Sequence, residues 1–283
     1  MSELTHPYSL APYRPVALAD LVRVGRHHDG GYVISQRSVA ATRVLVGLGI
    51  NADWSFEEAF VQANPAVRVV GLDGSVSGGV FRRRSAGGVV RGALAAARGR
   101  LGEAARHSRA ASGYLRVGRD FTRFFDGAPH VFVQKYLADV DSPTQVTWDT
   151  FAREQGLRAG PPAGLDVFVK MDIEGAEYRA LGALLADAGR INGLVVEFHD
   201  CDLLWERFAE IMAALDRDFA VAHMHGNNCV PLISGTSTPR VLEISFVNRC
   251  LLVGEAMPAA TEYPLGGLDM PNDPARPDYP LVF

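Results

Sequence analysis

The sequence predicts an α/β protein built on a doubly wound, mostly parallel sheet. Apolar runs typical of strands alternate with amphipathic helical segments along most of the chain, which is the pattern of a parallel sheet with helices on both faces. The last two apolar runs, 219–228 and 240–249, have no helix between them, so one should run antiparallel to the other. The chain has 283 residues, of which 48% are hydrophobic, which is enough for a large core.

Each expected element has a local signal. A turn at 29–31 precedes a short strand, and the buried run 43–50 ends in a glycine turn. Ser55 and Glu58 have the spacing of a capping box at the start of a helix over 55–65. By the same reasoning, further strands are expected at 67–74, 130–140, 165–175 and 191–200, and further helices at 146–156, 175–189 and 203–218, with a weakly periodic one at 91–107.

We expect one domain over 1–283 with an N-terminal extension (1–23), an Arg-rich insert (78–119) and a Pro-rich, irregular surface tail (257–283). From residue 82 to 119 there are ten arginines and one acid, Glu103, so this stretch carries +9 and the rest of the chain −13, which together give the net −4. Such a run is typical of a solvated insert and lacks the aromatics of a nucleic-acid stacking platform. Binding of nucleic acid is therefore not expected; binding of an anionic acceptor is an alternative hypothesis.

Cys201, Cys229 and Cys250 are isolated, which supports neither a thiolate zinc site nor a disulfide framework. The first 15 residues lack the apolar segment of a signal peptide, and no apolar run is long enough to span a membrane. We expect a cytoplasmic enzyme without a membrane partner, and a homo-oligomer remains an option.

A glycine turn follows the first convincing strand. Gly47-x-Gly49-x-x-Ala52 lets the backbone approach a ligand, and Asp73, at the end of the next strand, could accept hydrogen bonds from ribose hydroxyls. A plain strand-to-helix turn with Asp73 as an ordinary turn acid is the structural alternative. The two features together favour a ligand that resembles a nucleotide.

The charge of this turn favours one cofactor over another. Asp53, Glu57 and Glu58 lie at or just past the start of the following helix, where a pyrophosphate requires an end free of carboxylates. S-adenosylmethionine (SAM) has no phosphate and brings an ammonium and a sulfonium. We therefore prefer SAM to a nicotinamide cofactor.

Polar side chains gather where three strands end. Residues two apart share a face of a strand, so three groups should each point together: Asp172 with Glu174, Glu197 with His199, and His223 with His225 and Asn227. Each group has a structural alternative, such as a helix cap or a buried histidine with satisfied hydrogen bonds. Their expected convergence on one edge of the sheet favours a functional site.

Two chemistries remain open at this rim. His199 or His225 could remove a proton from a substrate hydroxyl. Asp172, Glu197 and His199 could instead hold a hard divalent ion such as Mg²⁺ that polarises the same hydroxyl. Glu177, one helical turn beyond Glu174, is expected to stabilise the helix dipole.

The segment "VFVKMDIEGAEYRAL" (167–181) resembles the signature block of the FkbM-type SAM-dependent methyltransferases. "VLVGLGINADWSFE", "VVGLDGS", "LVVEFHD", "HMHGNN" and "LEISFVNR" are similar to further blocks of that family, in the same order, so the resemblance spans about 24 to 283. Two features depart from it: residues 78–119 match nothing in the family, and Val46 stands where many methyltransferases have an acid.

The resemblance implies a Rossmann-like class I methyltransferase fold, seven strands with one antiparallel, and methyl transfer from SAM to a hydroxyl of a sugar or natural-product intermediate. It implies roles for four groups of residues. SAM would be held by Gly47, Gly49 and Asp73, with Asp53 on its amino group and Gln134, Lys135 and Tyr136 flanking the adenine; Asp172 and Glu174 would lie near the methyl group; His199 would face the acceptor; His225, Asn227 and Asn228 would bind that acceptor.

The alternative function is an NAD(P)-dependent oxidoreductase on a Rossmann-like sheet. It requires a helix start that accepts phosphate and a proton donor such as a Tyr-x-x-x-Lys pair, and neither is evident. The sequence thus favours a SAM-dependent O-methyltransferase with a small-molecule acceptor, and leaves Mg²⁺ dependence open.

Overall fold

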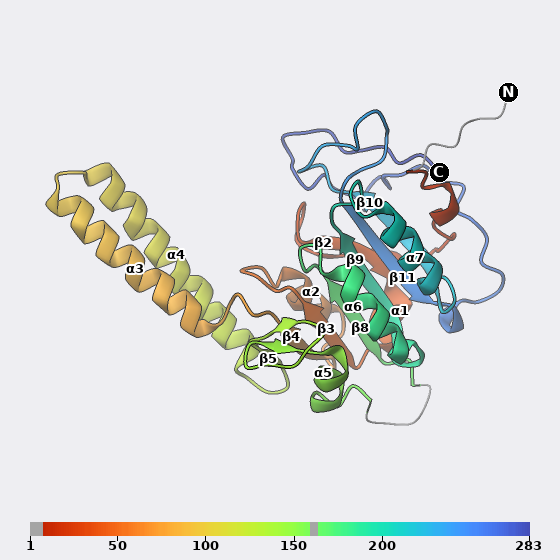
Figure 1. Cartoon of the computed structure of the whole chain (residues 1–283), viewed down its shortest axis with the longest axis horizontal. Coiled ribbons are helices and arrows are strands. Elements are labelled where there is room, and N and C mark those ends of the chain that lie inside the picture. Colours follow the sequence, from red (N-terminus) through yellow and green to blue (C-terminus); the bar gives the residue numbers. More distant parts are fainter. Residues whose placement is uncertain (1–7, 159–163) are drawn as a thin grey trace.

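A computed structural model of the chain describes residues 8–158 and 164–283, so the first seven residues of the expected N-terminal extension lie outside it. Its centre is a seven-stranded sheet (Figure 1). In spatial order the strands are β10 (Phe219–Gly226), β11 (Leu242–Asn248), β9 (Ile191–Phe198), β8 (Val167–Met171), β3 (Val44–Leu48), β4 (Arg68–Leu72) and β5 (Val131–Val133).

The strand directions confirm the expected sheet. β11 pairs antiparallel with both β10 and β9, while β9, β8, β3, β4 and β5 pair in parallel. The chain therefore has a Rossmann-like, mostly parallel sheet of seven strands with one antiparallel strand. β5 is shorter than the expected 130–140, because the chain leaves the sheet at Val133 and forms a two-stranded ribbon of β6 (Tyr136–Leu137) and β7 (Gln145–Val146).

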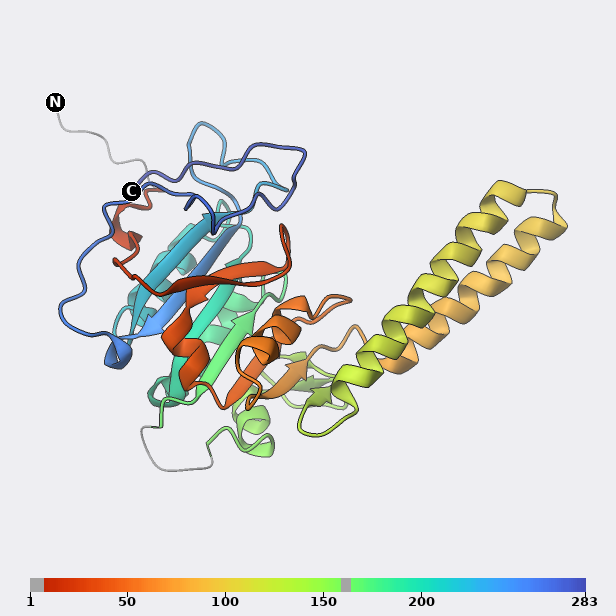
Figure 2. The same ribbon diagram turned by 180° about the vertical axis from the view of Figure 1, so that it is seen from behind.

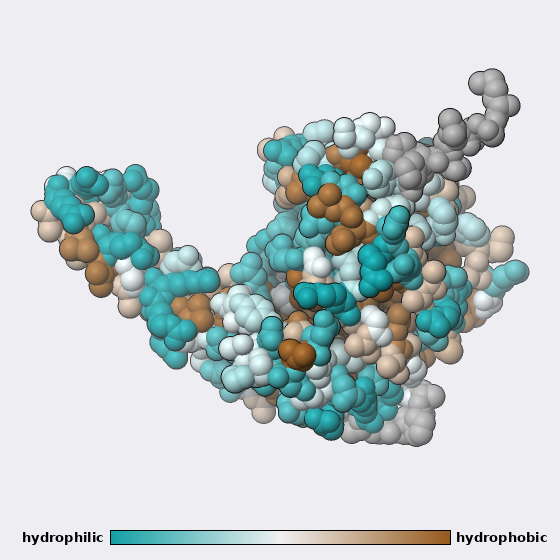
Figure 3. All heavy atoms as spheres, viewed as in Figure 1, coloured by the Kyte–Doolittle hydropathy of each residue, from teal (hydrophilic) through white to brown (hydrophobic). Residues whose placement is uncertain are grey.

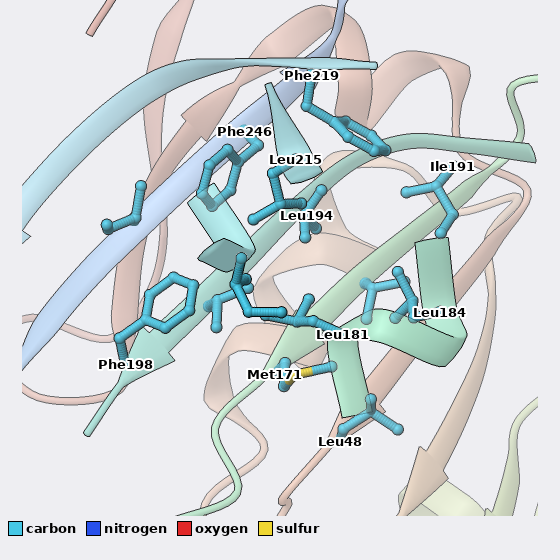
Figure 4. Close-up of a cluster of buried hydrophobic side chains, with 14 of the residues drawn as sticks. Leu48, Met171, Leu181, Leu184, Ile191, Leu194, Phe198, Leu215, Phe219 and Phe246 are labelled. Carbon is cyan, nitrogen blue, oxygen red and sulfur yellow. The ribbon is translucent and has the colours of Figure 1, made fainter. Parts of the chain in front are cut away.

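Helices cover both faces of the sheet, which explains why its parallel strands are almost continuously apolar. On one face, α5 (Trp148–Glu154), α6 (Glu177–Leu184) and α7 (Trp205–Leu215) cover Leu48, Met171 and Leu194, and Figure 4 shows Leu181 and Leu215 packed among these strands. On the other face, α1 (Gln36–Ala41) and α2 (Ser55–Ala63) cover Leu45 and Phe168.

The N-terminal part adds a hairpin to this second face. After the short 3-10 helix Ala11–Tyr13, β1 (Leu21–Gly25) and β2 (Gly31–Ser35) pair antiparallel around the expected turn at 29–31, and Figure 2 shows them crossing over the main sheet. Every residue of β2 is buried, including Tyr32. The hairpin thereby brings the turn at Asp29 and Gly30 toward the carboxyl ends of the parallel strands, where Gly30 and Asp53 lie side by side.

The Arg-rich insert is a helical hairpin that projects from the body (Figure 1). It consists of α3 (Gly78–Ala97) and α4 (Leu101–Phe125), so the expected helix at 91–107 is wrong: the chain reverses at 98–100, where Gly99 has a φ of +72°. Small residues such as Gly88 and Ala111 face each other in the seam and let the two helices approach closely. Hydrophilic residues predominate on its surface in Figure 3, and within the described chain Arg100 is its one arginine with an ion pair, to Glu103.

The tail from residue 257 has no helix or regular strand, as expected, but it is anchored by buried polar contacts. Asn228 donates from its side-chain amide to the carbonyls of Asp273, Arg276 and Pro277, and Tyr263 is buried in the core. Among the described residues, no helix combines the length and apolar character that crossing a bilayer requires.

Candidate active site

Two cavities adjoin at the carboxyl ends of β3, β4 and β8. The first has a volume of about 380 Å³ and the second about 400 Å³. Both are lined by Gly49, Asn51, Asp172 and Glu174, so these four residues form the boundary between them. This position, beyond the carboxyl ends of the central strands, is where ligands bind in doubly wound sheets.

The glycine turn brings the ends of β3 and β8 into contact. Gly49 has a φ of +79°, and a Cβ there would lie 1.7 Å from the carbonyl oxygen of Asp172. The Asp172 amide donates to the Leu48 carbonyl at 3.0 Å. A side chain at residue 49 would therefore push the two strand ends apart and displace Asp172 from the boundary between the cavities.

The second cavity brings together three of the residues expected to bind SAM, namely Asp73, Lys135 and Tyr136. Asp73 accepts from the amides of Asn51 (2.7 Å) and Ser75 (2.6 Å), which hold its carboxylate at the cavity wall. Lys135 and Tyr136 line the same cavity, and the Tyr136 ring packs directly over Gly74. Gln134 is exposed and is absent from both cavity linings, so the structure does not bring it to the other residues expected around an adenine.

Three carboxylates that line the first cavity lie close to His199, which itself lines neither cavity. His199 Nε2 is 3.9 Å from Asp172 Oδ1, 3.7 Å from Glu174 Oε2 and 3.9 Å from Glu197 Oε1. The expected strand alternation does not cause this convergence, because β8 ends at Met171. Instead, left-handed residues at Glu174 (φ +56°) and Gly175 (φ +91°) turn the chain back toward His199.

His199 is held from behind by Glu177. Oε1 of Glu177 lies 3.0 Å from His199 Nδ1 and also accepts from the Ile173 amide at 3.1 Å. Glu177 is fully buried in the first turn of α6, so the expected role at the helix dipole accounts for only part of what it does. Because Nδ1 is engaged, Nε2 is the nitrogen that faces the cluster.

The cluster has more negative charge than its neighbours can balance. Burial, together with the charges of Asp172 and Glu243, raises the pKa of Glu197 to about 8. Burial lowers the pKa of His199, but the hydrogen bond to Glu177 and the charge of Glu197 outweigh it and raise that pKa to about 9. The site thus retains protons that isolated side chains would lose, as expected where a cation could bind.

Sequence reasoning missed several residues of the first cavity. Tyr32 donates to Glu197 Oε2 at 3.2 Å, and Lys170 donates from Nζ to the Gly49 carbonyl at 2.7 Å while lying 3.5 Å from Asp172 Oδ2. Lys170 had a signal, since it is the one charge within an otherwise apolar strand. Tyr32 had none, because only the folded hairpin brings it to this cavity.

Asp53 is held by the protein itself. Its Oδ2 pairs with Arg26 Nε at 3.1 Å, and its Oδ1 accepts from the Ser55 amide at 3.0 Å. Ser55 is the first residue of α2, and the predicted capping box between Ser55 and Glu58 does not form. The Ser55 amide donates to Asp53, and the Glu58 carboxylate accepts from the Trp54 indole instead. The expected contact of Asp53 with a SAM amino group would compete with both interactions.

The third expected group of rim residues lies apart from the cluster. β11 separates β10 from β9, so His225 pairs with Glu243 (3.0 Å) and with Asp278 of the tail (2.9 Å). His223 pairs with Asp269 of the tail at 3.0 Å, and Asn228 holds the tail carbonyls. Of this group, Asn227 alone reaches the cluster, by donating to Glu197 Oε1 at 2.9 Å. The contacts of His225 and Asn228 anchor the tail rather than face either cavity.

No model of a known protein family matches the chain, and no curated protein matches its sequence. Solved structures with some similarity include precorrin-6y C5,15-methyltransferase from Geobacter metallireducens GS-15, at 13% identity over 75% of this chain and 85% of that one, with a TM-score of 0.34. A DUF574 protein from Streptomyces avermitilis is 9% identical over 75% and 80%, with a TM-score of 0.35. The O-methyltransferase NcsB1 of neocarzinostatin biosynthesis, solved with SAM, is 10% identical over 74% of this chain and 50% of its own, with a TM-score of 0.28.

Proposed function

We propose that this protein is a SAM-dependent O-methyltransferase that acts on a hydroxyl group of a sugar or natural-product intermediate. One observation carries the proposal: two cavities of different chemistry meet at Asp172. One has the aromatic ring and the turn acid of a nucleoside site, and the other is lined by carboxylates, two of which lie close to His199. The resemblance of residues 167–181 to FkbM-type methyltransferases agrees with this function.

The residues of the second cavity fit the adenosine part of SAM. The lone pairs that Asp73 keeps beside its two amide contacts can accept from ribose hydroxyls, and Tyr136 offers a ring face to an adenine. Gly49, at the boundary, lines both cavities and allows the ends of β3 and β8 to approach closely there. SAM supplies an electrophilic methyl group on a sulfonium, and the protein has to align an acceptor oxygen with it.

The cluster in the first cavity would prepare the acceptor. Asp172 and Glu174 can accept a hydrogen bond from an acceptor hydroxyl, and His199 Nε2 lies close enough to take up its proton. Glu177 keeps the imidazole in the orientation that this transfer requires. Because the pKa of His199 is about 9, most molecules carry a proton on it at neutral pH, and a base role would be limited to the deprotonated fraction.

A divalent cation fits the same residues. One ligand atom from each of Asp172, Glu174 and His199 lies within 4.8 Å of the others, and the Glu177 contact matches the carboxylate–histidine pairing that orients metal-bound imidazoles. Glu197, the third expected ligand, already receives hydrogen bonds from Tyr32 and Asn227. Mg²⁺ held by these residues would polarise an acceptor hydroxyl and lower its pKa.

The first cavity does not favour an anionic acceptor. Its lining holds six carboxylates, against the two cations Arg26 and Lys170. Of the arginines in the helical hairpin, Arg84 lines the second cavity and the others line neither. The hypothesis that the Arg-rich insert binds an anionic acceptor therefore receives no support from its position, and a neutral polyol or a cationic acceptor suits the carboxylates better.

The oxidoreductase alternative is not favoured by the start of α2. Asp53 already accepts from the Ser55 amide, and Glu57 and Glu58 lie in the first turn. A dinucleotide pyrophosphate would meet these carboxylates at the helix end that it normally binds through free amides.

Calorimetry with purified protein tests the proposal. We expect saturable SAM binding in a one-to-one ratio, and transfer of a methyl group to a hydroxyl when a panel of neutral, cationic and anionic sugars is screened by mass spectrometry. Absence of saturable SAM binding would contradict the proposed function. Methyl transfer only to nitrogen or carbon acceptors would contradict the O-methyl specificity alone.

A further inference from the structure

Glu57 is a buried carboxylate in the wall of the first cavity that has no partner in the described part of the chain. The residue is 1% exposed, and neither Oε1 nor Oε2 accepts a hydrogen bond from another described residue. It comes from the first turn of α2 and lines the first cavity together with Gly49 and Asn51. A buried, ionisable group without a partner is costly, so its retention in a cavity wall indicates a ligand.

The other carboxylates of this cavity are engaged or solvated. Asp53 pairs with Arg26, Asp172 lies near Lys170, and Glu197 accepts from Tyr32 and Asn227. Asp29 and Glu174 have well-exposed side chains that water can solvate. Glu57 is therefore the carboxylate of this cavity, among the described residues, that is both buried and without a partner.

The nearby lysine does not satisfy Glu57. Lys170 Nζ donates to the Gly49 carbonyl at 2.7 Å and lies 3.5 Å from Asp172; burial raises the pKa of Glu57 and the charge of Lys170 opposes this rise, but no ion pair between the two forms within the described residues. The fold nevertheless makes room for the carboxylate. A Cβ at Gly47 would lie 2.5 Å from Glu57 Oε1, so the first glycine of the turn leaves the space that this side chain fills.

The position of Glu57 identifies the kind of group that it would bind. Its carboxylate lies against Gly47 of β3 and lines the first cavity but not the second, and thus lies on the side of the boundary opposite the nucleoside cavity. A cofactor with its nucleoside beside Asp73 would extend its other end toward Glu57. A desolvated carboxylate with two free oxygens is complementary to an ammonium group, which has three donors and a positive charge.

We propose that Glu57 binds the α-ammonium group of the methionine part of SAM. The proposal rests on the proposed function and deepens it, because it assigns the amino-group contact to Glu57 instead of Asp53. Val46, in the middle of β3 and at the position where many methyltransferases have an acid, is buried in the core with residues of α6 and α7, so the carboxylate is supplied by the following helix.

The test compares ligands that contain or lack the ammonium group. In calorimetry, Glu57→Gln should weaken binding of SAM and of S-adenosylhomocysteine about 10- to 100-fold, the loss of a charge-assisted hydrogen bond. The same substitution should weaken the binding of decarboxylated SAM, which keeps the ammonium group but lacks the carboxylate, by the same factor. Binding of 5′-methylthioadenosine, which lacks the whole amino-acid part, should stay unchanged.

Two neighbours provide matched controls. Glu58→Gln changes the next residue of α2, whose carboxylate accepts from the Trp54 indole and does not line either cavity. Asp53→Asn removes the carboxylate that sequence reasoning favoured for the same contact. We expect neither variant to weaken binding of S-adenosylhomocysteine selectively while leaving binding of 5′-methylthioadenosine unchanged, as Glu57→Gln should.

The outcomes separate the inference from the proposed function. If wild-type protein binds no SAM, the proposed function fails and this inference with it. If wild type binds SAM and Glu57→Gln binds it equally tightly, the inference alone is overturned. If the variant does not fold, the affinities of the wild-type protein provide the test. We expect wild type to bind S-adenosylhomocysteine at least 10-fold more tightly than 5′-methylthioadenosine, and equal affinities would overturn the inference.

Discussion

Glu177 Oε1 lies 3.0 Å from His199 Nδ1, and this contact links the first turn of α6 to the end of β9 beneath the candidate site. The carboxylate is fully buried and its second contact is the Ile173 amide, so its position is set by the backbone. His199 thereby turns Nε2 toward Asp172 and Glu174.

His199→Ala should lower turnover at least 100-fold while changing SAM affinity by less than about 3-fold, because the imidazole acts on the acceptor side of the site. Steady-state kinetics and calorimetry measure the two effects. Equal losses of turnover and of SAM affinity would contradict the assigned role.

Glu177→Gln should lower turnover roughly 10- to 100-fold, the range for residues that orient a functional histidine. Removing this carboxylate also removes an influence that raises the pKa of His199, so the pH profile of turnover should shift to lower pH. A loss of turnover with an unshifted profile would indicate a merely structural role for Glu177.

Asp73→Asn should weaken SAM binding about 10-fold or more, because an amide cannot offer charged acceptors to ribose hydroxyls. The variant retains one oxygen for the Asn51 or Ser75 amide, so we expect it to fold. Asp216→Asn, which alters an exposed carboxylate paired with Arg249, is the control. Unchanged affinity in Asp73→Asn would remove Asp73 from the cofactor site.

Metal dependence distinguishes the two roles of the carboxylate cluster. If Asp172, Glu174 and His199 hold a divalent ion, chelation should abolish turnover and added Mg²⁺ should restore it. Asp172→Asn should weaken Mg²⁺ binding in a calorimetric titration, whereas Asp141→Asn, an exposed acid far along the chain in the β6–β7 connection, should not. Full activity in the presence of a chelator would exclude the metal role and leave the base role.

The pH dependence of stability tests the burial of Glu57. Burial raises the pKa of Glu57 from 4.5 to about 7, so between these values the folded state binds more protons than the unfolded state. The free energy of unfolding of ligand-free wild type should therefore fall, relative to that of Glu57→Gln, by roughly 1–3 kcal/mol as the pH rises from 4.5 to 7. Urea denaturation at several pH values measures it, and parallel curves for the two proteins would contradict the prediction.

The tail has a pH dependence of the same sign, but in a higher pH range. Burial lowers the pKa of His225, but hydrogen bonds to Asp278 and Glu243 outweigh it and raise the pKa from 6.5 to about 10. The stability that this contact contributes should be complete below pH 6.5 and be lost as the pH rises through 10. Asp278→Asn should lose stability at pH 7 and make the tail more sensitive to limited proteolysis; an unchanged free energy of unfolding would contradict the role of this contact.

Much of the sheet could be predicted from the sequence because its signals are local. The apolar runs at 43–50, 67–74 and 191–200 each form a strand, and the missing helix after 228 explains the antiparallel β11. The helical hairpin at 78–125 was predicted only as one helix over 91–107, because Gly88, Gly92 and Ala111 give little hydrophobic periodicity. These small residues suit the close contact between its two helices.

The sequence by itself determined the sheet, the glycine turn and the set of acids and histidines at the strand ends, because strand periodicity and turn chemistry depend on neighbours in the chain. Only the tertiary structure decided which of those side chains meet. The insertion of β11 between β9 and β10 takes His225 to the tail, the left-handed turn at Glu174 brings that residue to His199, and burial leaves Glu57 without a partner. Pairing and desolvation depend on contacts between distant segments, which no local pattern encodes.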